Sequence, residues 1–252
     1  LFNSYTFIFA FLPITFFIYF YLNQKKLTEV AKGVLILSSL FFYSWWHIAY
    51  LPIILSSIFF NYTIGSQLNK STAKSASLNK AVSGGGYLPH KKVILIIGII
   101  ANIALLGYFK YSNFFIQNFN SITSSNIELL NLSLPLAISF FTFQQITYLV
   151  DSYRQETKEY DFLNYVLFVT FFPQLIAGPI VHHKEMMPQF ANIRNKVKNY
   201  RNIAMGLFIF SIGLFNKVVI DDIFVVWVLS GFDRAKTLNV FEALCMLAFY
   251  TF

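Results

Sequence analysis

Long apolar stretches without formal charge alternate along this chain with shorter stretches that carry lysine and arginine. A helix needs about 20 apolar residues to cross a hydrocarbon core of roughly 30 Å, so the uncharged stretches are candidate membrane spans. We expect helical spans near residues 5–22, 33–47, 52–66, 93–109, 132–150 and 202–220. The predicted fold class is all-α, a polytopic integral membrane protein with 1–252 as a single transmembrane domain.

The uncharged run between Lys32 and Lys70 is too long for one crossing. It holds 37 residues, which is about 55 Å of helix at 1.5 Å per residue. The chain must therefore turn back within it. The best place is 45–52, which holds a Trp-Trp-His string and a proline, because tryptophan prefers the membrane interface and proline starts a helix easily.

The uncharged window at 162–181 differs from the others because it contains Pro173, Gly178 and Pro179. These residues break or end a helix, and the freed backbone groups need protein or water around them rather than lipid. If the window crossed the membrane, the basic segment 182–201 would lie outside, against the positive-inside rule. We therefore predict that 162–181 is re-entrant.

Basic residues also set the predicted topology, because short cytoplasmic loops keep lysine and arginine. The loop 23–32 and the linker 67–92, which is rich in Ser, Lys and Gly, are both basic. We place both in the cytoplasm. The amino terminus then lies on the extracytoplasmic side of the cell (inner or plasma) membrane, and the chain crosses it several times.

Two further stretches have the spacing of helices that lie in the membrane interface. In one, apolar residues share a face of a predicted helix whose basic residues lie off that face: Phe190, Ile193, Val197 and Tyr200. In the other, aromatic residues form a shorter face for the outer surface: Tyr111, Phe115 and Phe119. A plain linking helix is the alternative for both.

Composition and charge favour a membrane over other partners. The chain is 56% hydrophobic and only 12% charged, whereas soluble domains are roughly 25% charged. The net charge of +8 in this apolar background indicates an anionic membrane surface rather than nucleic acid. The single cysteine, Cys245, excludes an internal disulfide, and no Cys/His cluster has metal-ligand spacing, so no metal site is expected.

Few residues carry recognisable chemistry. No Gly-x-Ser-x-Gly or His-Glu-x-x-His string is present, which excludes the common serine-hydrolase and zinc-protease motifs. His182 and His183 follow the predicted re-entrant window, where a proton carrier could act, but no carboxylate or nucleophile at a recognised spacing supports them. Polar residues within apolar windows, such as Gln144, face a protein interior or a water cavity; hydrogen bonding between helices is the alternative role.

Specific strings carry more information than composition. LPLAISFFTFQQITYLVDSYR at 134–154 and FLNYVLFVTFFPQLIAGPIV at 162–181 closely resemble the membrane-bound O-acyltransferase (MBOAT) family, and within it the alginate O-acetyltransferase type. Three shorter strings agree in the same order: FNSYTFIFAFLPIT at 2–15, FFYSWW at 41–46 and LGYFKYSNFF at 106–115. The resemblance covers the whole chain.

This resemblance implies acyl transfer from a cytoplasmic thioester donor, acetyl-CoA or an acyl carrier, to a hydroxyl of an exported polysaccharide such as alginate. The family's catalytic histidine stands in a Trp-His-Gly string, and none of the four histidines here does. Family members are nearly twice as long. We therefore expect that histidine beyond Phe252 and expect this chain alone to be inactive.

What the resemblance assigns to this chain is the tunnel wall and the donor-access mouth. The residues at the matching positions are Gln144, Tyr148, Asp151, Tyr153, Arg154, Pro173, Gln174, Gly178 and Pro179. His182 and His183 remain acid/base candidates by position alone. The expected partners are the lipid bilayer, the acyl donor or its carrier protein, and an extracytoplasmic protein that accepts or passes on the acyl group. No bound cofactor and no nucleic acid are expected.

A non-catalytic membrane scaffold or a transporter-like subunit is the competing hypothesis, because kinked, polar-lined segments also suit a substrate pathway. The reading frame after Phe252 separates the two. Continuation into a Trp-His-Gly string supports the enzyme, and a stop codon supports the scaffold.

Overall fold

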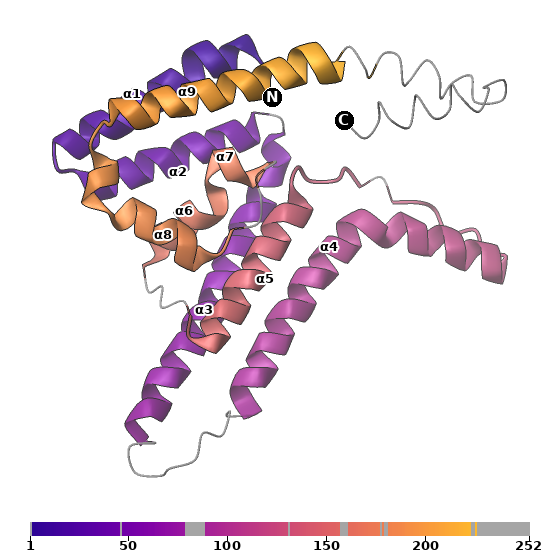
Figure 1. Ribbon diagram of the computed structural model, residues 1–252. Coiled ribbons are helices and arrows are strands. Elements are labelled where there is room, and N and C mark those ends of the chain that lie inside the picture. Colours follow the sequence, from indigo (N-terminus) through magenta and orange to yellow (C-terminus); the bar gives the residue numbers. More distant parts are fainter. Residues whose placement is uncertain are drawn as a thin grey trace, which may run out of the picture. The chain divides into compact units, whose positions relative to one another are not determined.

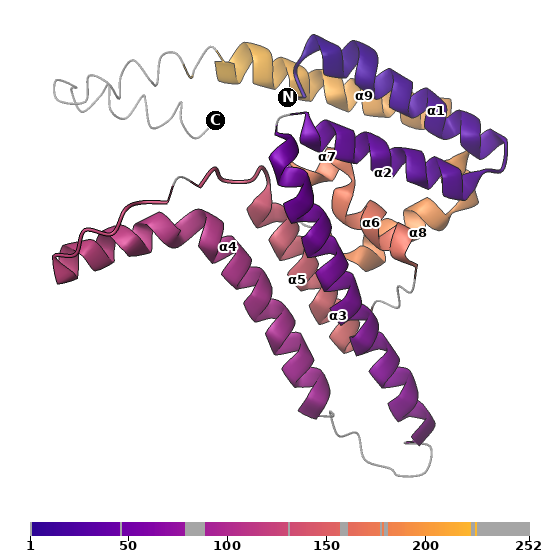
Figure 2. The ribbon, with the colours of Figure 1, turned by 180° about the vertical axis from the view of Figure 1, so that it is seen from behind.

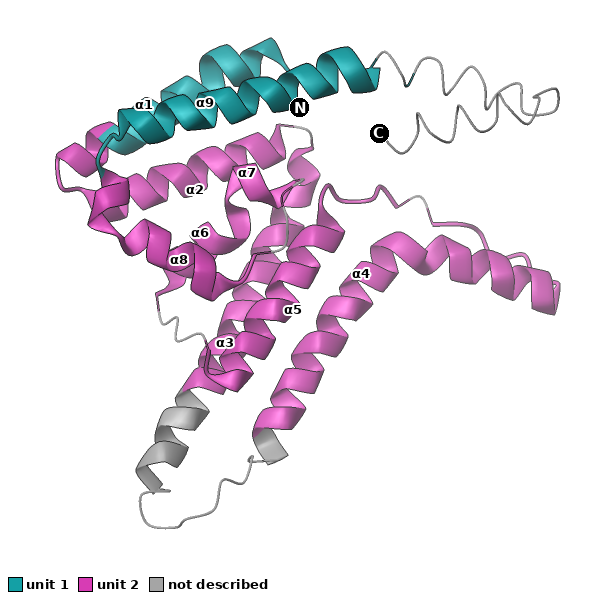
Figure 3. Ribbon diagram, in the orientation of Figure 1, with its two compact units in different colours: residues 1–20, 197–252 teal, residues 21–196 magenta. Residues whose placement is uncertain are grey.

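Helices make up the regular structure of the described part of the chain. The computed structural model describes residues 2–45, 47–78, 89–130, 132–156, 161–176, 178, 181–222 and 225, and no β-strand occurs in these ranges. The predicted all-α class is confirmed. The chain divides into two compact units, a small unit of residues 1–20 with 197–252 and a large unit of residues 21–196 (Figure 3).

Three long helices form a bundle in the large unit. They are α3 (Leu51–Leu78), α4 (Pro89–Thr123) and α5 (Ile138–Arg154), and each contacts the other two (Figures 1 and 2). A Cβ added at Gly65 of α3 would lie 2.7 Å from the Tyr148 hydroxyl of α5. A Cβ added at Gly98 of α4 would lie 2.8 Å from Leu149 Cδ1. Glycine at these two contacts lets the helices approach closely.

The shorter helices of the large unit gather around α2 (Thr28–Ser44), which runs crosswise to α3 in both views (Figures 1 and 2). α2 contacts α6 (Phe162–Thr170) and α7 (Phe172–Leu175), and α6 also contacts α3, α5 and α8 (His183–Ala191). Near the start of α2, Lys32 donates to Asn164 of α6 at 2.8 Å. Every residue of α6 from Tyr165 to Thr170 is buried, so all but the first turn of this short helix lies in the interior of the unit.

The chain turns between α2 and α3 within residues 45–52, the stretch where the sequence pattern places a turn. A short 3₁₀ helix covers Ile48–Tyr50, and Pro52 falls in the first turn of α3, where its missing N–H costs no helical hydrogen bond. Tyr43 and Tyr50 flank the turn and hold the segment that leads into α5. Tyr43 donates to the carbonyl of Leu136 at 3.0 Å, and the Tyr50 hydroxyl lies 2.6 Å from that of Ser133.

The small unit contains helices with mainly exposed apolar surfaces. A π-helical segment, Phe7–Phe11, leads into α1 (Leu12–Gln24), whose last residues belong to the large unit. α9 (Tyr200–Phe215) continues into a second π-helical segment, Asn216–Asp221, and neither buries a side chain. A helix that is apolar all round and unburied by protein suits a lipid environment.

Among the described residues, four helical stretches are long and apolar enough to cross a membrane: Phe7–Gln24, Ile48–Asn69, Lys91–Thr123 and Tyr200–Asp221. They overlap the predicted spans at 5–22, 52–66, 93–109 and 202–220. The predicted spans at 33–47 and 132–150 overlap α2 and α5, which have 17 residues each. Such a helix is about 26 Å long, so whether these two cross the bilayer stays a prediction.

α4 is longer than one crossing requires. Its apolar part, Lys91–Thr123, has 33 residues, or about 50 Å of helix. The helix bends, and its second half turns away from α5 (Figures 1 and 2). Tyr111, Phe115 and Phe119 are exposed on that second half, as expected for an aromatic face in the interface.

The prediction of one basic amphipathic helix through residues 190–200 is wrong. α8 ends at Ala191, residues Ile193–Lys196 form a 3₁₀ turn, and α9 starts only at Tyr200. The physical reason lies in two asparagines that offer the backbone local hydrogen bonds. Asn192 accepts from the Arg194 N–H at 3.0 Å, and Asn199 caps α9 by accepting from the Arg201 and Asn202 N–H groups.

Candidate functional site at the broken helix

The predicted re-entrant window contains two short helices with a break between them. Asp161 caps α6 by accepting from the Leu163 N–H at 3.1 Å. The chain leaves helical geometry at Phe171 (φ −51°, ψ 106°) and resumes it in the four-residue α7. With nine residues, α6 is about 14 Å long, half the thickness of a hydrocarbon core.

Pro173 explains why the helix must break, although the break lies two residues before it. A proline inside a continuous helix has no N–H to donate, and its ring clashes with the carbonyl four residues earlier. Because a new helix starts at Phe172, Pro173 falls in its first turn, where neither problem arises. The Pro173 side chain itself is exposed.

The break removes one backbone hydrogen bond and frees its donor and its acceptor. Each of the two freed groups bonds a side chain from another helix. In an uninterrupted helix the Phe172 N–H would donate to the Phe168 carbonyl. Instead, Gln144 of α5 donates through Nε2 to the Phe168 carbonyl at 2.8 Å. The Phe172 N–H donates to Ser39 Oγ of α2 at 3.2 Å. The family resemblance implies a wall role for Gln144, whereas nothing in the sequence indicates Ser39.

Gly178 is held against the preceding turn. Its N–H donates to the Gln174 carbonyl at 2.9 Å. An added Cβ would lie 2.5 Å from Gln174 Cα and 2.8 Å from Gln174 O, so a larger residue would collide with backbone. Gln174 is half-buried, and Pro179 lies outside the described residues.

A cluster of aromatic rings fills the space between α5, α6 and α8. The Tyr148 and Tyr165 ring centroids are 4.4 Å apart. His183, at the start of α8, lies 5.9 Å from Tyr148 and 5.0 Å from Phe168, ring centre to ring centre. Tyr148 and Tyr165 are fully buried and His183 is nearly so. Two of the predicted residues, Tyr148 and His183, therefore meet in the interior.

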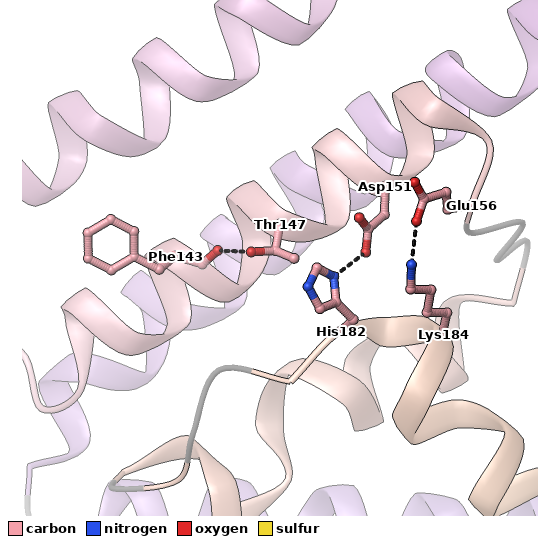
Figure 4. A network of polar contacts seen from close by, with 6 residues as sticks. All are labelled: Phe143, Thr147, Asp151, Glu156, His182 and Lys184. Carbon is pink, nitrogen blue, oxygen red and sulfur yellow. Dashed lines mark hydrogen bonds and ion pairs between the residues drawn. The ribbon is translucent and has the colours of Figure 1, made fainter.

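Asp151 and His182 also meet, at the junction of α5 and α8 (Figure 4). His182 Nδ1 lies 3.0 Å from Asp151 Oδ2, so the nitrogen donates and the carboxylate accepts. The Asp151 side chain is 3% exposed and that of His182 is 46% exposed. A buried carboxylate thus orients an imidazole that reaches the surface, an arrangement that can hold or pass a proton.

A second pair joins α8 to the segment just after α5 (Figure 4). Lys184 Nζ donates to Glu156 Oε2. That hydrogen bond and the Lys184 charge lower the pKa of Glu156, with smaller contributions from Arg154 and His182. The Glu156 partner raises the pKa of Lys184. Both side chains are exposed, so the pair is weak and sensitive to salt.

The remaining predicted residues lie at the edge of this site. Tyr153 is half-buried and Arg154 is exposed at the last turn of α5. Thr147 bonds back to the Phe143 carbonyl of its own helix at 3.0 Å, also shown in Figure 4. No group of three or more His, Cys, Asp and Glu side chains suited to a metal ion occurs in the part of the chain that the structure describes.

The family model for MBOAT, the membrane-bound O-acyltransferase family, matches residues 94–252. The chain belongs to this family. The resemblance noted from its strings is confirmed, and the chain is a multi-pass membrane protein.

Curated relatives of this MBOAT chain carry names that refer to O-acetylation. It is 46% identical to "Peptidoglycan O-acetyltransferase" of Helicobacter pylori, over 100% of this chain and 50% of that protein. It is 31% identical to "Probable alginate O-acetylase AlgI" of Pseudomonas aeruginosa, over 88% of this chain and 40% of that protein. The Azotobacter vinelandii protein of the same name is also 31% identical, over 88% of this chain and 41% of that protein. The chain thus spans about half the length of the curated relatives it matches or less, and no solved structure matches it.

Proposed function

We propose that this chain is part of a membrane-bound O-acyltransferase that transfers an acetyl group from a cytoplasmic thioester donor to a hydroxyl of a cell-envelope polysaccharide. The observation that carries the proposal is the 46% identity over the full chain to a peptidoglycan O-acetyltransferase. The identity to the alginate O-acetylases is lower, at 31%. Peptidoglycan is therefore our first choice of acceptor, and an exported polymer such as alginate is the second.

The reaction makes two demands. A hydroxyl is a poor nucleophile until a positioned base accepts its proton, and attack on the thioester carbonyl develops an oxyanion that needs hydrogen-bond donors. The ester forms, the carbon–sulfur bond breaks, and the thiolate leaves and takes up a proton. We do not assign the base to a histidine of this chain, because none stands in a Trp-His-Gly string.

The role that we propose for this chain is to build the donor-side wall. Irregular backbone at membrane depth is tolerated where it lines a cavity or is buried in protein. The break at Phe171 is buried in protein, because Gln144 and Ser39 bond the backbone groups that it frees. We propose a location in the cytoplasmic membrane with the amino terminus outside. The proposed partners are acetyl-CoA or an acyl carrier protein on the inside and an acyl-accepting protein or glycan on the outside.

The test starts from deletion of the gene that encodes this chain in its own host. Mild base releases acetate from esters but not from the amides of the glycan, so ester acetate per muramic acid measures O-acetylation. We expect it to fall to background in the deletion strain and to return on complementation, while amide-linked acetate stays unchanged. The same assay on exported polysaccharide shows which acceptor is used.

A second measurement separates an enzyme from a scaffold. Isolated membranes given acetyl-CoA, or an acetylated carrier protein, should release free thiol in proportion to the ester formed. Membranes from the deletion strain should not. Unchanged ester acetate on both polymers would rule out the proposed function.

A further inference from the structure

Polar side chains line the contact between α3 and α5 through several helical turns. On α3, Ser57, Asn61, Gly65 and Asn69 follow one another at intervals of four residues, so they share one side of the helix. The two helices run parallel, because Ser57 and Asn61 meet Gln145 and, further along, Gly65 meets Tyr148. We call this contact the α3–α5 seam.

One part of the seam is a closed hydrogen-bond network. Gln145 Oε1 accepts from Ser57 Oγ at 2.7 Å and also from Asn61 Nδ2. Asn102 of α4 donates to Asn61 Oδ1 at 2.6 Å and to the Gly98 carbonyl at 2.7 Å. Two donors on Gln145 Oε1 fix the orientation of that amide. Its Nε2 group therefore points away from the network.

Other polar atoms on α3, α5 and the adjoining α6 have no hydrogen-bond partner among the described residues. They are Thr142 Oγ1, Gln145 Nε2, Ser152 Oγ, Asn69 Nδ2 and the hydroxyl of Tyr165, whose ring packs on that of Tyr148. All five side chains are at least nine-tenths buried. An unpaired polar group in an apolar interior costs free energy, so five of them in one region indicate a ligand that pairs with them.

The chemistry of these atoms selects the ligand. The two amide nitrogens only donate, so they repel a metal cation, whereas the three hydroxyls both donate and accept. Water pairs with both kinds of group and is small enough to enter a packed seam. We propose that the α3–α5 seam binds a row of water molecules beside the unpaired atoms. This site is independent of the acyltransferase proposal.

The row leads along α5 toward the Asp151–His182 pair. Thr142 and Ser152 are ten residues apart, about 15 Å along the helix. Ser152 is next to Asp151, and the half-exposed His182 ring bonded to Asp151 reaches the surface. Bound water there joins the buried seam to a proton-carrying side chain at the α5–α8 junction.

Hydroxyl-radical footprinting with short X-ray pulses tests the proposal, because radiolysis of bound water labels the side chains that touch it. The full chain would be measured in lipid nanodiscs. Tyr165 and Tyr43 are matched reporters, because both are 0% exposed. They differ in one respect: the Tyr43 hydroxyl donates to the Leu136 carbonyl, whereas the Tyr165 hydroxyl has no partner in the described ranges. We expect Tyr165 to be labelled several-fold faster. Equal, slow labelling of both would overturn the proposal.

A pair of threonine variants gives a second, independent reading. Thr142 and Thr170 are both fully buried, and Thr170 donates to the Val166 carbonyl at 2.8 Å whereas Thr142 Oγ1 has no partner in the described part. If water pairs with Thr142, Thr142→Val loses a hydrogen bond, and the melting temperature falls as it does for Thr170→Val. A higher melting temperature for Thr142→Val means that the hydroxyl was dry, and the water row is then excluded.

Discussion

At the scale of single residues, the break between α6 and α7 depends on Gln144. Gln144→Leu removes the donor to the Phe168 carbonyl and leaves that carbonyl buried without a partner. The expected loss is about 1–3 kcal/mol of stability. Gln117→Leu, on an exposed face of α4, is the control and should be near neutral. Thermal unfolding of the two variants in detergent checks this, and equal melting temperatures would contradict the assigned role.

Gly65 is the glycine of the bundle with the least room for a side chain. Gly65→Ala brings a Cβ to 2.7 Å from the Tyr148 hydroxyl, so α3 and α5 must move apart. The expected cost of such overpacking is roughly 1–3 kcal/mol. Gly107→Ala is a matched control, because nothing lies within 4 Å of its added Cβ. That variant should gain about 0.5–1 kcal/mol from helix propensity, and a urea titration that ranks the two in the opposite order would disprove the close contact.

Residue by residue, the sequence could indicate one partner of most contacts but not the other. Gln144 stands out because a polar group is costly in an apolar window, whereas Tyr148 and Asp151 are indicated only by the family resemblance. Ser39 gives no such signal, since serine is common in helices and its partner Phe172 is 133 residues away in the chain. Asn61 likewise gives no signal in the sequence, and its bonds to Asn102 and Gln145 become apparent only when α3, α4 and α5 are assembled.

At the scale of elements, the Glu156–Lys184 pair links the end of α5 to the start of α8 over a defined pH range. The pKa of Glu156 is lowered from 4.5. The stability that its carboxylate contributes is therefore present above pH 4.5 and is lost as the pH falls through the lowered pKa. The pKa of Lys184 is raised from 10.5. The stability that its ammonium group contributes is therefore present below pH 10.5 and is lost as the pH rises through the raised pKa. The link therefore operates across the neutral range.

Hydrogen exchange in the first turn of α8 measures this link. At neutral pH and low salt, Glu156→Gln should exchange faster there than the wild type, and the difference should vanish once the pH is below the lowered pKa of Glu156. Arg194→Met removes an exposed charge outside the pair and should change nothing. A difference that persisted in acid would show that Glu156 acts through packing and not through its charge.

Two elements show what sequence periodicity can and cannot predict. The broken window 162–181 was predictable because Pro173 cannot lie inside a helix, although the break moved to Phe171 so that the proline could take a first-turn position. The continuous helix at 190–200 was a wrong prediction because spacing alone ignores side-chain caps. Asn192 and Asn199 each bond nearby backbone N–H groups, and these local bonds outweigh an apolar periodicity over so short a stretch.

At the scale of the whole molecule, the membership in MBOAT and the exposed apolar helices establish a multi-pass membrane protein. The direction in which each helix crosses is a separate matter. It rests on the basic loops and on α6, which at nine residues is too short to cross a core of roughly 30 Å. If α6 and α7 enter and leave on one side, the segments before and after 162–181 lie on the same side of the membrane.

Single-cysteine labelling tests that topology directly. In a Cys245→Ala background, cysteines are placed one at a time at Lys25, Ser125 and Lys196, and spheroplasts are treated with a membrane-impermeant maleimide. Ser125 follows α4 in segment 110–131. That segment lies outside if the linker 67–92 is cytoplasmic and 93–109 crosses the membrane, so we expect rapid labelling there. Lys25 and Lys196 should react only after permeabilisation, because both belong to basic cytoplasmic segments. Labelling of Lys196 from outside, with Lys25 still protected, would mean that 162–181 crosses the bilayer and that its broken helices are not re-entrant.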